Sequence, residues 1–471
     1  MQKRSGYLTG SIGSTMLKTA VAMVPGTLAM VGYNLADAYY VGKLGTAPQA
    51  AMAYSLPVIM LLGCVFHGIA TGISAPAAML LGSDAREKAA RLVSAGLLLL
   101  ALCSIILGLL GINCIGWTFR QFGARGEALE LVSGYMSIWY LGCVTGSLSM
   151  AGNNILIATG DSRWAGGMMI FGMTLNVILD PLLIFGYAGL PALGIRGAAI
   201  ATVLAQLVAA LMVLILLKKR YRLLIFRNWD LVWLPKLWRT VIRYAIPASI
   251  GMLLMPLGTA VITRITAHFG DAAVAGCGIA ARIESFAFIF PMALGMSLMP
   301  MVGQNFGAQF YSRIRQCRRF AMHFAFLYLG AMAVIYFFAA PFMAGLFSTD
   351  PLVQRTAVLF LRIVPWGFGM IEIHRYSGFF FTGCAFPAAA AWLNALRILG
   401  LMLPLSFLAL LLNSVAWLFI ARLVGDVLAG SIGCWGAARL TSRFPPDGQA
   451  VPEAFTETPV LSFWLPRMRK T

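Results

Sequence analysis

Charged residues are scarce in this sequence. Only 11% of the 471 residues are charged and 60% are hydrophobic, whereas about a quarter of the residues in a typical globular chain carry a charge. This balance excludes a large soluble core and predicts a polytopic membrane protein. No small-residue cleavage site follows the first apolar run, so we expect no cleaved signal peptide.

Motifs of enzymatic chemistry and of metal binding are also missing. The four histidines stand alone without HExxH spacing, and no GxSxG, Walker A or GxGxxG motif occurs. The eight cysteines lie singly in or beside apolar segments, without a CxxC pair, which is typical of reduced core residues. These absences exclude an ATP-driven pump on this chain, argue against an enzyme, and predict neither a cofactor nor a sulfur-bound metal.

Acidic residues are outnumbered by basic ones, 16 against 35, for a net charge of +19. The basic residues cluster in short loops between apolar spans, a pattern of membrane orientation rather than of nucleic-acid binding. We therefore expect a multi-pass protein of the cell inner membrane with both termini cytoplasmic. The expected partners are the bilayer and a small molecule, with no nucleic acid, and we expect a monomer.

Twelve apolar segments are long enough to cross a bilayer as helices. They lie near 14–40, 50–81, 91–115, 131–153, 165–187, 198–217, 243–268, 279–301, 319–341, 356–381, 389–412 and 415–438. The predicted fold class is an all-α polytopic membrane protein with twelve transmembrane helices in two pseudo-symmetric six-helix lobes.

The two halves of the chain look like a repeat. A polar break, about Lys218 to Arg243, separates six spans from six. Pro25 in the first span corresponds to Pro247 in the seventh, and Pro181 in the fifth to Pro404 in the eleventh, at a shared offset of about 220 residues. An even number of spans per half gives a parallel repeat.

These landmarks set four expected regions. Residues 1–222 form an N-lobe with a cation site, 223–242 a cytoplasmic linker, 243–443 a C-lobe and 444–471 a cytoplasmic tail. The prolines of that tail indicate a loosely ordered extension.

Five acids fall within the spans, and they differ in whether a basic residue lies near them on the same helix. They are Asp37, Asp180, Glu284, Glu372 and Asp426. Asp426 has Arg422 one turn away, and Glu372 is followed three residues later by Arg375, so both acids can form intrahelical pairs with a structural role. The spacing leaves the role of Glu284 open.

Asp180 has no such partner on its own helix. A charge in hydrocarbon costs roughly 2.5–3.5 kcal/mol on insertion scales, so its presence needs a reason. Asn176 lies one turn before it on the same face, and Pro181 weakens the helix and frees a backbone carbonyl, which suits a cation site. Asp37 resembles Asp180, because its one nearby base, Lys43, already lies in the outer loop.

Depth in the membrane groups these two acids with other polar residues. Asp37, Asp180 and Thr202 each lie about 8 to 9 Å below the outer boundary, counted at the helical rise per residue. Asn34 and Asn176 would add amide oxygens, which gives two carboxylates, two amides and a hydroxyl for H⁺ or Na⁺. Two neighbouring carboxylates in a poor solvent cannot both stay ionised cheaply, so the pair should hold a proton. In the alternative interpretation, the two acids only bond to backbone near the outer surface.

The sequence resembles the multidrug and toxic compound extrusion (MATE) family, especially its DinF-like branch, over roughly residues 10 to 440. The resemblance rests on Asn34-Leu35-Ala36-Asp37, Val41-Gly42-Lys43-Leu44-Gly45, Ala158-Thr159-Gly160-Asp161, Asn176 to Gly186, Gly197 to Thr202 and Gly303-Gln304-Asn305-Phe306-Gly307-Ala308. It implies two six-helix lobes and a secondary antiporter that exports cationic or amphipathic drugs or toxic compounds in exchange for H⁺ or Na⁺ by rocker-switch alternating access.

The resemblance also implies roles for single residues. The matching aspartates, asparagine and threonine form the N-lobe cation site, with Na⁺ as a candidate ion at Asp37 and Asp180, and Pro25 allows the first helix to bend. Relatives of the NorM type add acids on helices 7 and 10, of which this chain has only Glu372 as an approximate match. The residues proposed to line a substrate cleft are Asn153, Asn154, Met173, Glu284 and Glu372.

Two further functions stay open from the sequence. A lipid-linked precursor flippase of the same superfamily would need cationic residues for an anionic pyrophosphate, and four arginines within or beside the spans could supply them. They are Arg264, Arg282, Arg375 and Arg397. A membrane-embedded enzyme is the third class, disfavoured by the lack of clustered histidines or nucleophile motifs.

Overall fold

The computed structural model describes residues 6–225 and 233–450. The side chains of residues 30, 31, 34 and 35 lie outside the described part. Within the described ranges the regular elements are all helical, which agrees with the predicted all-α fold class.

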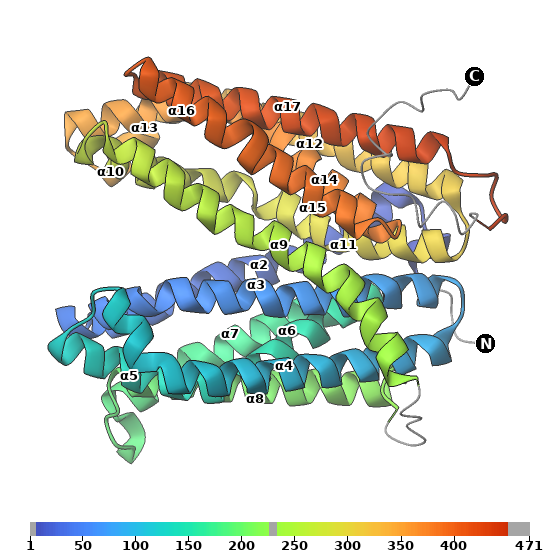
Figure 1. The fold of residues 1–471 in the computed structure, drawn as a ribbon, viewed down its shortest axis with the longest axis horizontal. Coiled ribbons are helices and arrows are strands. Elements are labelled where there is room, and N and C mark those ends of the chain that lie inside the picture. Colours follow the sequence, from blue (N-terminus) through green and yellow to red (C-terminus); the bar gives the residue numbers. More distant parts are fainter. Residues whose placement is uncertain (1–5, 226–232, 451–471) are drawn as a thin grey trace. The chain divides into compact units, whose positions relative to one another are not determined.

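The first half of the chain forms helices that follow one another with short turns (Figure 1). They are α1 (Gly6–Thr9), α2 (Ile12–Gly42), α3 (Thr46–Gly82), α4 (Arg86–Gln121), α5 (Gly126–Leu141), α6 (Cys143–Ala158), α7 (Ser162–Phe185), the short 3₁₀ turn η1 (Tyr187–Gly189) and α8 (Ile195–Lys219).

The second half is more interrupted. It contains α9 (Leu234–Ala267), α10 (Asp271–Ala287), α11 (Ile289–Gly307), α12 (Tyr311–Phe347), α13 (Pro351–Ile363), the 3₁₀ turn η2 (Val364–Gly367), α14 (Phe368–Gly383), α15 (Pro387–Ala395), the π-helix η3 (Leu396–Met402), α16 (Leu403–Leu411) and α17 (Val415–Ser442). Proline accompanies several of the breaks, at Pro351, Pro365, Pro387 and Pro404, as expected where the proline ring removes a backbone donor.

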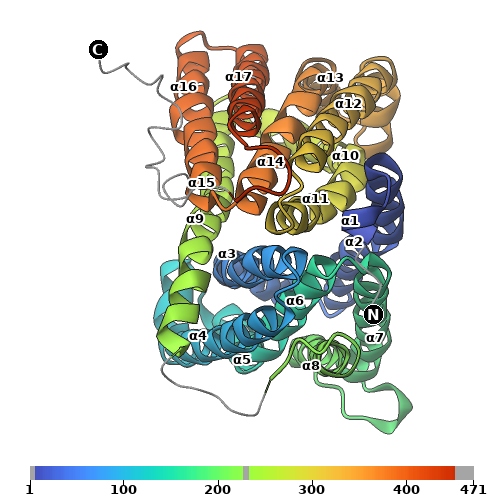
Figure 2. The same ribbon diagram turned by 90° about the vertical axis from the view of Figure 1, so that its right-hand side faces the viewer.

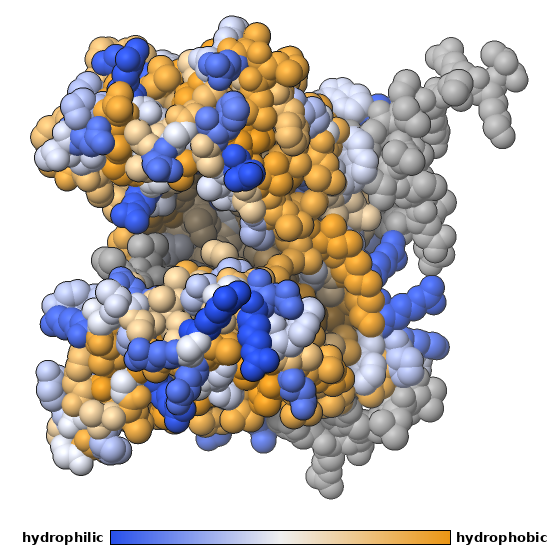
Figure 3. All heavy atoms as spheres, turned by 60° about the vertical axis from the view of Figure 1, so that its left-hand side comes forward, coloured by the Kyte–Doolittle hydropathy of each residue, from blue (hydrophilic) through white to orange (hydrophobic). Residues whose placement is uncertain are grey.

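The described helices account for the expected membrane spans. Nine helical stretches are long and apolar enough to cross a bilayer, and two bent pairs, α5 with α6 at 52° and α10 with α11 at 55°, supply two more. Helix α2, with 31 residues, is long enough to be the twelfth. Apolar side chains cover much of the molecular surface in Figure 3, as expected for helices that face lipid.

The chain divides into two compact units. The N-unit comprises Val21–Ser249, and the C-unit comprises Met1–Ala20 together with Ile250–Thr471. Two long helices, α2 and α9, therefore each contribute residues to both units.

The predicted linker is shorter in the structure than in the sequence analysis. Helix α9 begins at Leu234, so residues 234–242 of the expected linker are helical. Pro235 suits the first turn of a helix, where its missing N–H is not needed. Trp238 in this added stretch donates its indole N–H to the Ala95 carbonyl at 2.9 Å. Residues 226–232 of the predicted linker lie outside the described residues.

The first residues of the predicted tail are not loosely ordered. The Asp447 carboxylate accepts hydrogen bonds from the backbone N–H of Ser312, at 2.8 Å, and from the Ser312 hydroxyl. Tyr311 donates to the Gln449 carbonyl at 3.0 Å. These bonds hold the segment against the start of α12, where a carboxylate satisfies a free N–H of the first turn. Residues 451–471 of the predicted tail lie outside the described residues.

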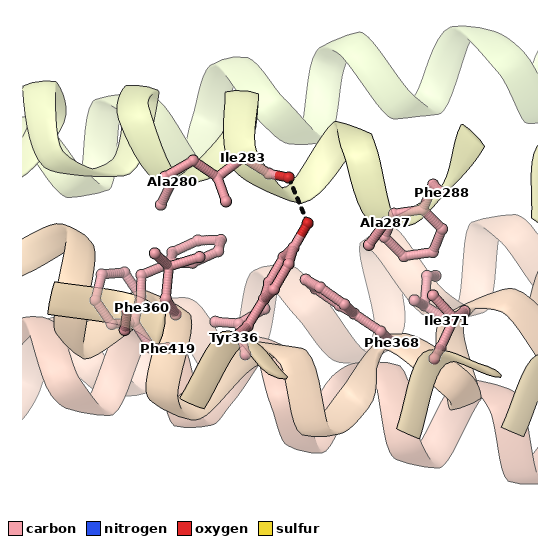
Figure 4. Packing of buried hydrophobic residues seen from close by; sticks show 13 residues of the cluster. Ala280, Ile283, Ala287, Phe288, Tyr336, Phe360, Phe368, Ile371 and Phe419 are labelled. Carbon is pink, nitrogen blue, oxygen red and sulfur yellow. Dashed lines mark hydrogen bonds between the residues drawn. The ribbon is translucent and has the colours of Figure 1, made fainter. Parts of the chain in front are cut away.

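A core cluster of the C-unit packs residues of α10, α12, α13, α14 and α17 together (Figure 4). Phe288 and Phe368 lie with ring centroids 5.0 Å apart, and Phe360 meets Phe419 at 5.1 Å. Tyr336 donates its hydroxyl to the Ile283 carbonyl at 2.8 Å. The phenol thus satisfies its polar atom inside an apolar cluster.

In the N-unit, a close backbone approach fixes the start of α8. A Cβ atom on Gly197 would overlap the carbonyl oxygen of Leu183 on α7. Only glycine therefore fits where these two helices converge. This contact sets the position of the residues that follow on α8, including Thr202.

We expect Gly197→Ala to lower the stability of the folded protein by about 1–3 kcal/mol, because the added methyl group meets backbone that cannot move aside. Unfolding of the purified protein by heat or denaturant would measure the change. Gly116→Ala is the matched control, because a Cβ at that helical position meets nothing within 4 Å. Equal stability of Gly197→Ala and the wild type would contradict the packing argument.

Candidate functional site

Two acidic side chains meet inside the N-unit. Asp37 near the end of α2 is 4% exposed, and Asp180 on α7 is fully buried. Their carboxyl groups lie within hydrogen-bonding reach of each other. The structure thus brings together two acids that are 143 residues apart in the sequence.

Polar groups from three helices surround this pair. The Asn176 amide lies 3.4 Å from Asp180 Oδ1 and 3.4 Å from Thr202 Oγ1, in position to donate to both. The Tyr33 hydroxyl lies 3.3 Å from Thr202 Oγ1 and also hydrogen-bonds the Asp37 carboxyl. Asn176 and Thr202 are buried with the acids, so the cluster is a desolvated polar site within apolar helices.

Oxygen atoms of this cluster are left without partners. Asp37 Oδ1, Asp180 Oδ2 and Asn176 Oδ1 are buried and have no hydrogen-bond partner among the described residues. No ion pair to either carboxyl occurs among the described side chains. A buried charge without a partner is costly. The arrangement therefore suits a bound proton or cation, which would neutralise the pair.

The local sequence of α7 helps to build this site. Asp180 and Asn176 share a helix face because they are four residues apart. Pro181 lies inside α7, and its missing N–H removes the usual helical donor for the Val177 carbonyl. The Val177 carbonyl, one residue after Asn176 in the sequence, thus has weakened helical bonding.

Two tyrosines of the site were missed by the sequence analysis. Tyr33 lies four residues before Asp37 on α2, so helical spacing could have indicated it. Tyr135 on α5 is buried and lies close enough to Asp37 and Asp180 to interact electrostatically with both carboxyl groups. Nothing in the sequence distinguishes Tyr135 from an ordinary aromatic residue of a membrane helix.

The other predicted residues of the N-unit are more scattered. Asn34 was expected in the cation site, but its side chain lies outside the described part. Pro25, the expected bend, lies within α2. On α6, Asn153 and Asn154 are half-buried, and Asn153 Oδ1 has no partner among the described residues. Met173 is half-buried against α2, where a Cβ on Gly32 would lie 2.8 Å from its methyl group.

The three acids predicted within the spans of the C-unit are ion-paired. Glu372 is buried and pairs with Arg375, as their spacing predicts. Glu284, left open by the sequence, pairs with Arg422 of α17.

Asp426 forms the intrahelical pair expected for it and a second, shorter pair with another element. Its nearer partner is Arg397 of η3, at 2.8 Å, while Arg422 on its own helix is 3.7 Å away. Arg422 thus connects Glu284 to Asp426, and Arg397 completes a chain of two acids and two bases across α10, α17 and η3. These acids already have counter-charges, unlike the pair in the N-unit.

Sequence comparison identifies the group of proteins to which this chain is related. The family model described as MatE matches residues 23–182 and 247–420. A FAD transporter of Shewanella oneidensis is 33% identical over 440 residues, which cover 93% of this chain and 97% of the relative. The multidrug export protein MepA of Staphylococcus aureus is 26% identical over 377 residues, 78% of this chain and 80% of that protein.

The chain belongs to the MATE family. A crystal structure of the Vibrio cholerae MATE transporter VcmN in the bent form matches this MATE chain with a TM-score of 0.87 and 27% identity, over 92% of this chain and 98% of that one. The predictions of a twelve-helix, two-lobe membrane protein and of a transporter rather than an enzyme are therefore confirmed. Membership of the DinF-like branch stays a prediction.

In this MATE transporter we expect the C-unit ion pairs to be structural. Asp426→Asn would leave the largely buried Arg397 without its counter-charge, which should cost about 3–5 kcal/mol of stability. Denaturant unfolding of the purified protein would measure it. The exposed Glu87 in its pair with Arg91 provides the control, because Glu87→Gln should change little in a solvated pair. Unchanged stability of Asp426→Asn would argue against a structural role.

Proposed function

We propose that this MATE transporter is a secondary antiporter that exports amphipathic small molecules in exchange for H⁺ or Na⁺. Asp37 and Asp180 form the proposed coupling site. The observation that carries the proposal is the contact between two buried carboxyl groups that have unpaired oxygens and no basic partner among the described side chains.

A change of charge at this site would drive the transport cycle. Two carboxyl groups in contact cannot both ionise cheaply, so the site has a neutralised state and a costly charged state. In the proposed cycle the inward-facing protein releases the ion and takes up substrate. The outward-facing protein then reloads Asp37 and Asp180, and their neutralisation expels the substrate. The ion acts by binding one conformation more tightly than the other, in a rocker-switch exchange.

The chemistry of the donor set is compatible with either ion. A proton needs one carboxyl oxygen, whereas Na⁺ would use several oxygens, and Asp37, Asp180 and Asn176 each offer one that is unpaired among the described residues. The site lies wholly within the N-unit. We therefore propose Asn176 and Thr202 as positioning groups for the acids, together with Asn34 as predicted from its place on α2.

Relatives support two substrate classes. MepA is a multidrug export protein, which supports cationic or amphipathic drugs as substrates. The relative with 33% identity is a FAD transporter, and this favours a flavin dinucleotide as the second candidate. In both cases we propose Asn153, Asn154 and Met173 of the N-unit as substrate contacts, with Glu284 and Glu372 as candidates in the C-unit.

The flippase alternative receives less support from the charges. Two of the four arginines that it would use, Arg375 and Arg397, are neutralised by Glu372 and Asp426. An anionic pyrophosphate would have to compete with those carboxylates for the guanidinium groups.

Asp180→Asn should abolish gradient-driven export while leaving the protein in the membrane, because an amide cannot take up or release the coupling charge. Efflux of ethidium from cells, set against the amount of transporter in the membrane fraction, would test this. Asp84→Asn is the matched control, since Asp84 is exposed and its backbone has a positive φ of 60°, a conformation that asparagine also tolerates. Full transport by Asp180→Asn would refute the assignment.

Everted vesicles would separate the two substrate classes and the two ions. We expect uptake of ethidium into vesicles when an H⁺ or a Na⁺ gradient is imposed alone, and no uptake without a gradient. Gradient-driven uptake of FAD instead of ethidium would favour the second candidate. Uptake of either compound that needs no ion gradient would contradict the antiport proposal.

A further inference from the structure

Arginines gather where the start of α12 contacts the end of α17 in the C-unit, and Figures 1 and 2 show these two helices. They are Arg315, Arg318 and Arg319 on α12, Arg439 on α17, and Arg443 directly after α17. Asp447 is coupled electrostatically to Arg315 and is already engaged by Ser312. Arg318 and Arg319 form no ion pair among the described side chains, so their two positive charges are available to an anion.

Two contacts define how the helices face each other here. Arg315 Nη1 donates to the Thr441 carbonyl at 3.3 Å. Seven residues later on α12 and seven residues earlier on α17, Cys434 Sγ lies 3.7 Å from Met322 Sδ. Because both steps equal two helical turns, the seam between α12 and α17 is continuous over this length. Arg318 lies on the same face of α12, between Arg315 and Met322.

The guanidinium group of Arg318 has few hydrogen-bond acceptors for a group at a helix contact. Its Nε is buried and has no hydrogen-bond partner among the described residues. Its Nη1 contacts only a thioether, Met322 Sδ, at 3.8 Å, and thioether sulfur is a weak acceptor. No described carboxylate forms an ion pair with it. A planar guanidinium fork with unmet donors fits the oxygens of a phosphate group.

Exposed apolar side chains lie further along both helices from these basic residues. Phe326 and Leu327 on α12 are 58% and 68% exposed, and Leu428 and Trp435 on α17 are exposed as well. Arg439 lies over the Trp435 ring, 5.0 Å from its centroid, and tryptophan at the end of a membrane helix is typical of the lipid interface. A free anion would use only the basic end, whereas a phospholipid would also cover the apolar side chains.

We propose that the seam between α12 and α17 binds the phosphate headgroup of an anionic phospholipid, with Arg318 as its main ligand and Arg319 as a second charge. The orientation predicted from the basic loops puts this seam in the cytoplasmic leaflet, where anionic headgroups attract juxtamembrane bases. The site is distinct from the proposed coupling pair, which lies in the other unit.

Binding of phosphatidylglycerol to the purified transporter would test the proposal, with phosphatidylcholine as the neutral lipid. Native mass spectrometry would count retained lipids, and thermal unfolding would measure the stabilisation by each lipid. We expect the wild type to retain phosphatidylglycerol preferentially. Arg318→Gln and Arg319→Gln should each weaken that binding roughly fivefold, the effect of one arginine at a membrane surface.

Arg91→Gln is the matched control, because Arg91 is an exposed base near the start of another long helix, α4, where it is paired with Glu87. It should retain phosphatidylglycerol as the wild type does. Because Arg319 is exposed, Arg319→Gln should fold even if Arg318→Gln does not. Unchanged phosphatidylglycerol binding in a folded Arg318→Gln protein, or in Arg319→Gln when Arg318→Gln fails to fold, would overturn the proposal. Equal stabilisation by inorganic phosphate would overturn the lipid assignment.

Discussion

The contact between Asp37 and Asp180 inside the N-unit is the constraint on which the proposed mechanism depends. Two carboxyl groups in contact in an apolar environment have few protonation states of low free energy, because ionising both would place like charges together without solvent. Neutralisation by H⁺ or Na⁺ relieves that cost and needs no basic side chain. Hydrogen bonds of Asn176, Thr202 and Tyr33 hold the pair in one arrangement. The free-energy difference between the charged and the neutralised pair can therefore act on the conformation of the protein, because the two side chains cannot simply move apart.

The C-unit meets the same constraint in a different way. Its acids have permanent partners, since Arg375 neutralises Glu372 and Arg397 neutralises Asp426. A buried pair of this kind offers no site that must gain or lose an ion to stay neutral, and the pair of Arg397 with Asp426 also joins η3 to α17. The repeated scaffold thus carries a polar cluster of each type. Among the buried acids that the structure describes, Asp37 and Asp180 are the two without an ion pair.

Hydropathy was sufficient to predict the spans, because lipid requires long apolar helices, whereas the family was predicted from the resemblance of its motifs. Counting residues from the span ends placed Asp37, Asp180 and Thr202 at one depth, which works because the helical rise is constant. Counting residues could not give the rotation of each helix about its own axis, which decides the side chains that meet between helices. The pair between Arg397 and Asp426 and the proximity of Tyr135 were missed for this reason. The start of α9 at Leu234 was missed because polar residues in a helix beyond the membrane look like a loop by hydropathy.

Ion exchange at the N-unit pair alone would separate coupling from substrate choice. If ion exchange is confined to the N-unit pair, a change in substrate class need not alter Asp37 or Asp180, and relatives that carry a flavin dinucleotide or drugs could share one coupling site. Substrate polarity would then be set by side chains that keep a constant charge during the cycle. The C-unit pairs keep a constant net charge in this way, because Glu372 and Asp426 each have an arginine partner. The buried acids that the structure describes are thus of two kinds, one exchangeable in the proposed cycle and one permanently paired.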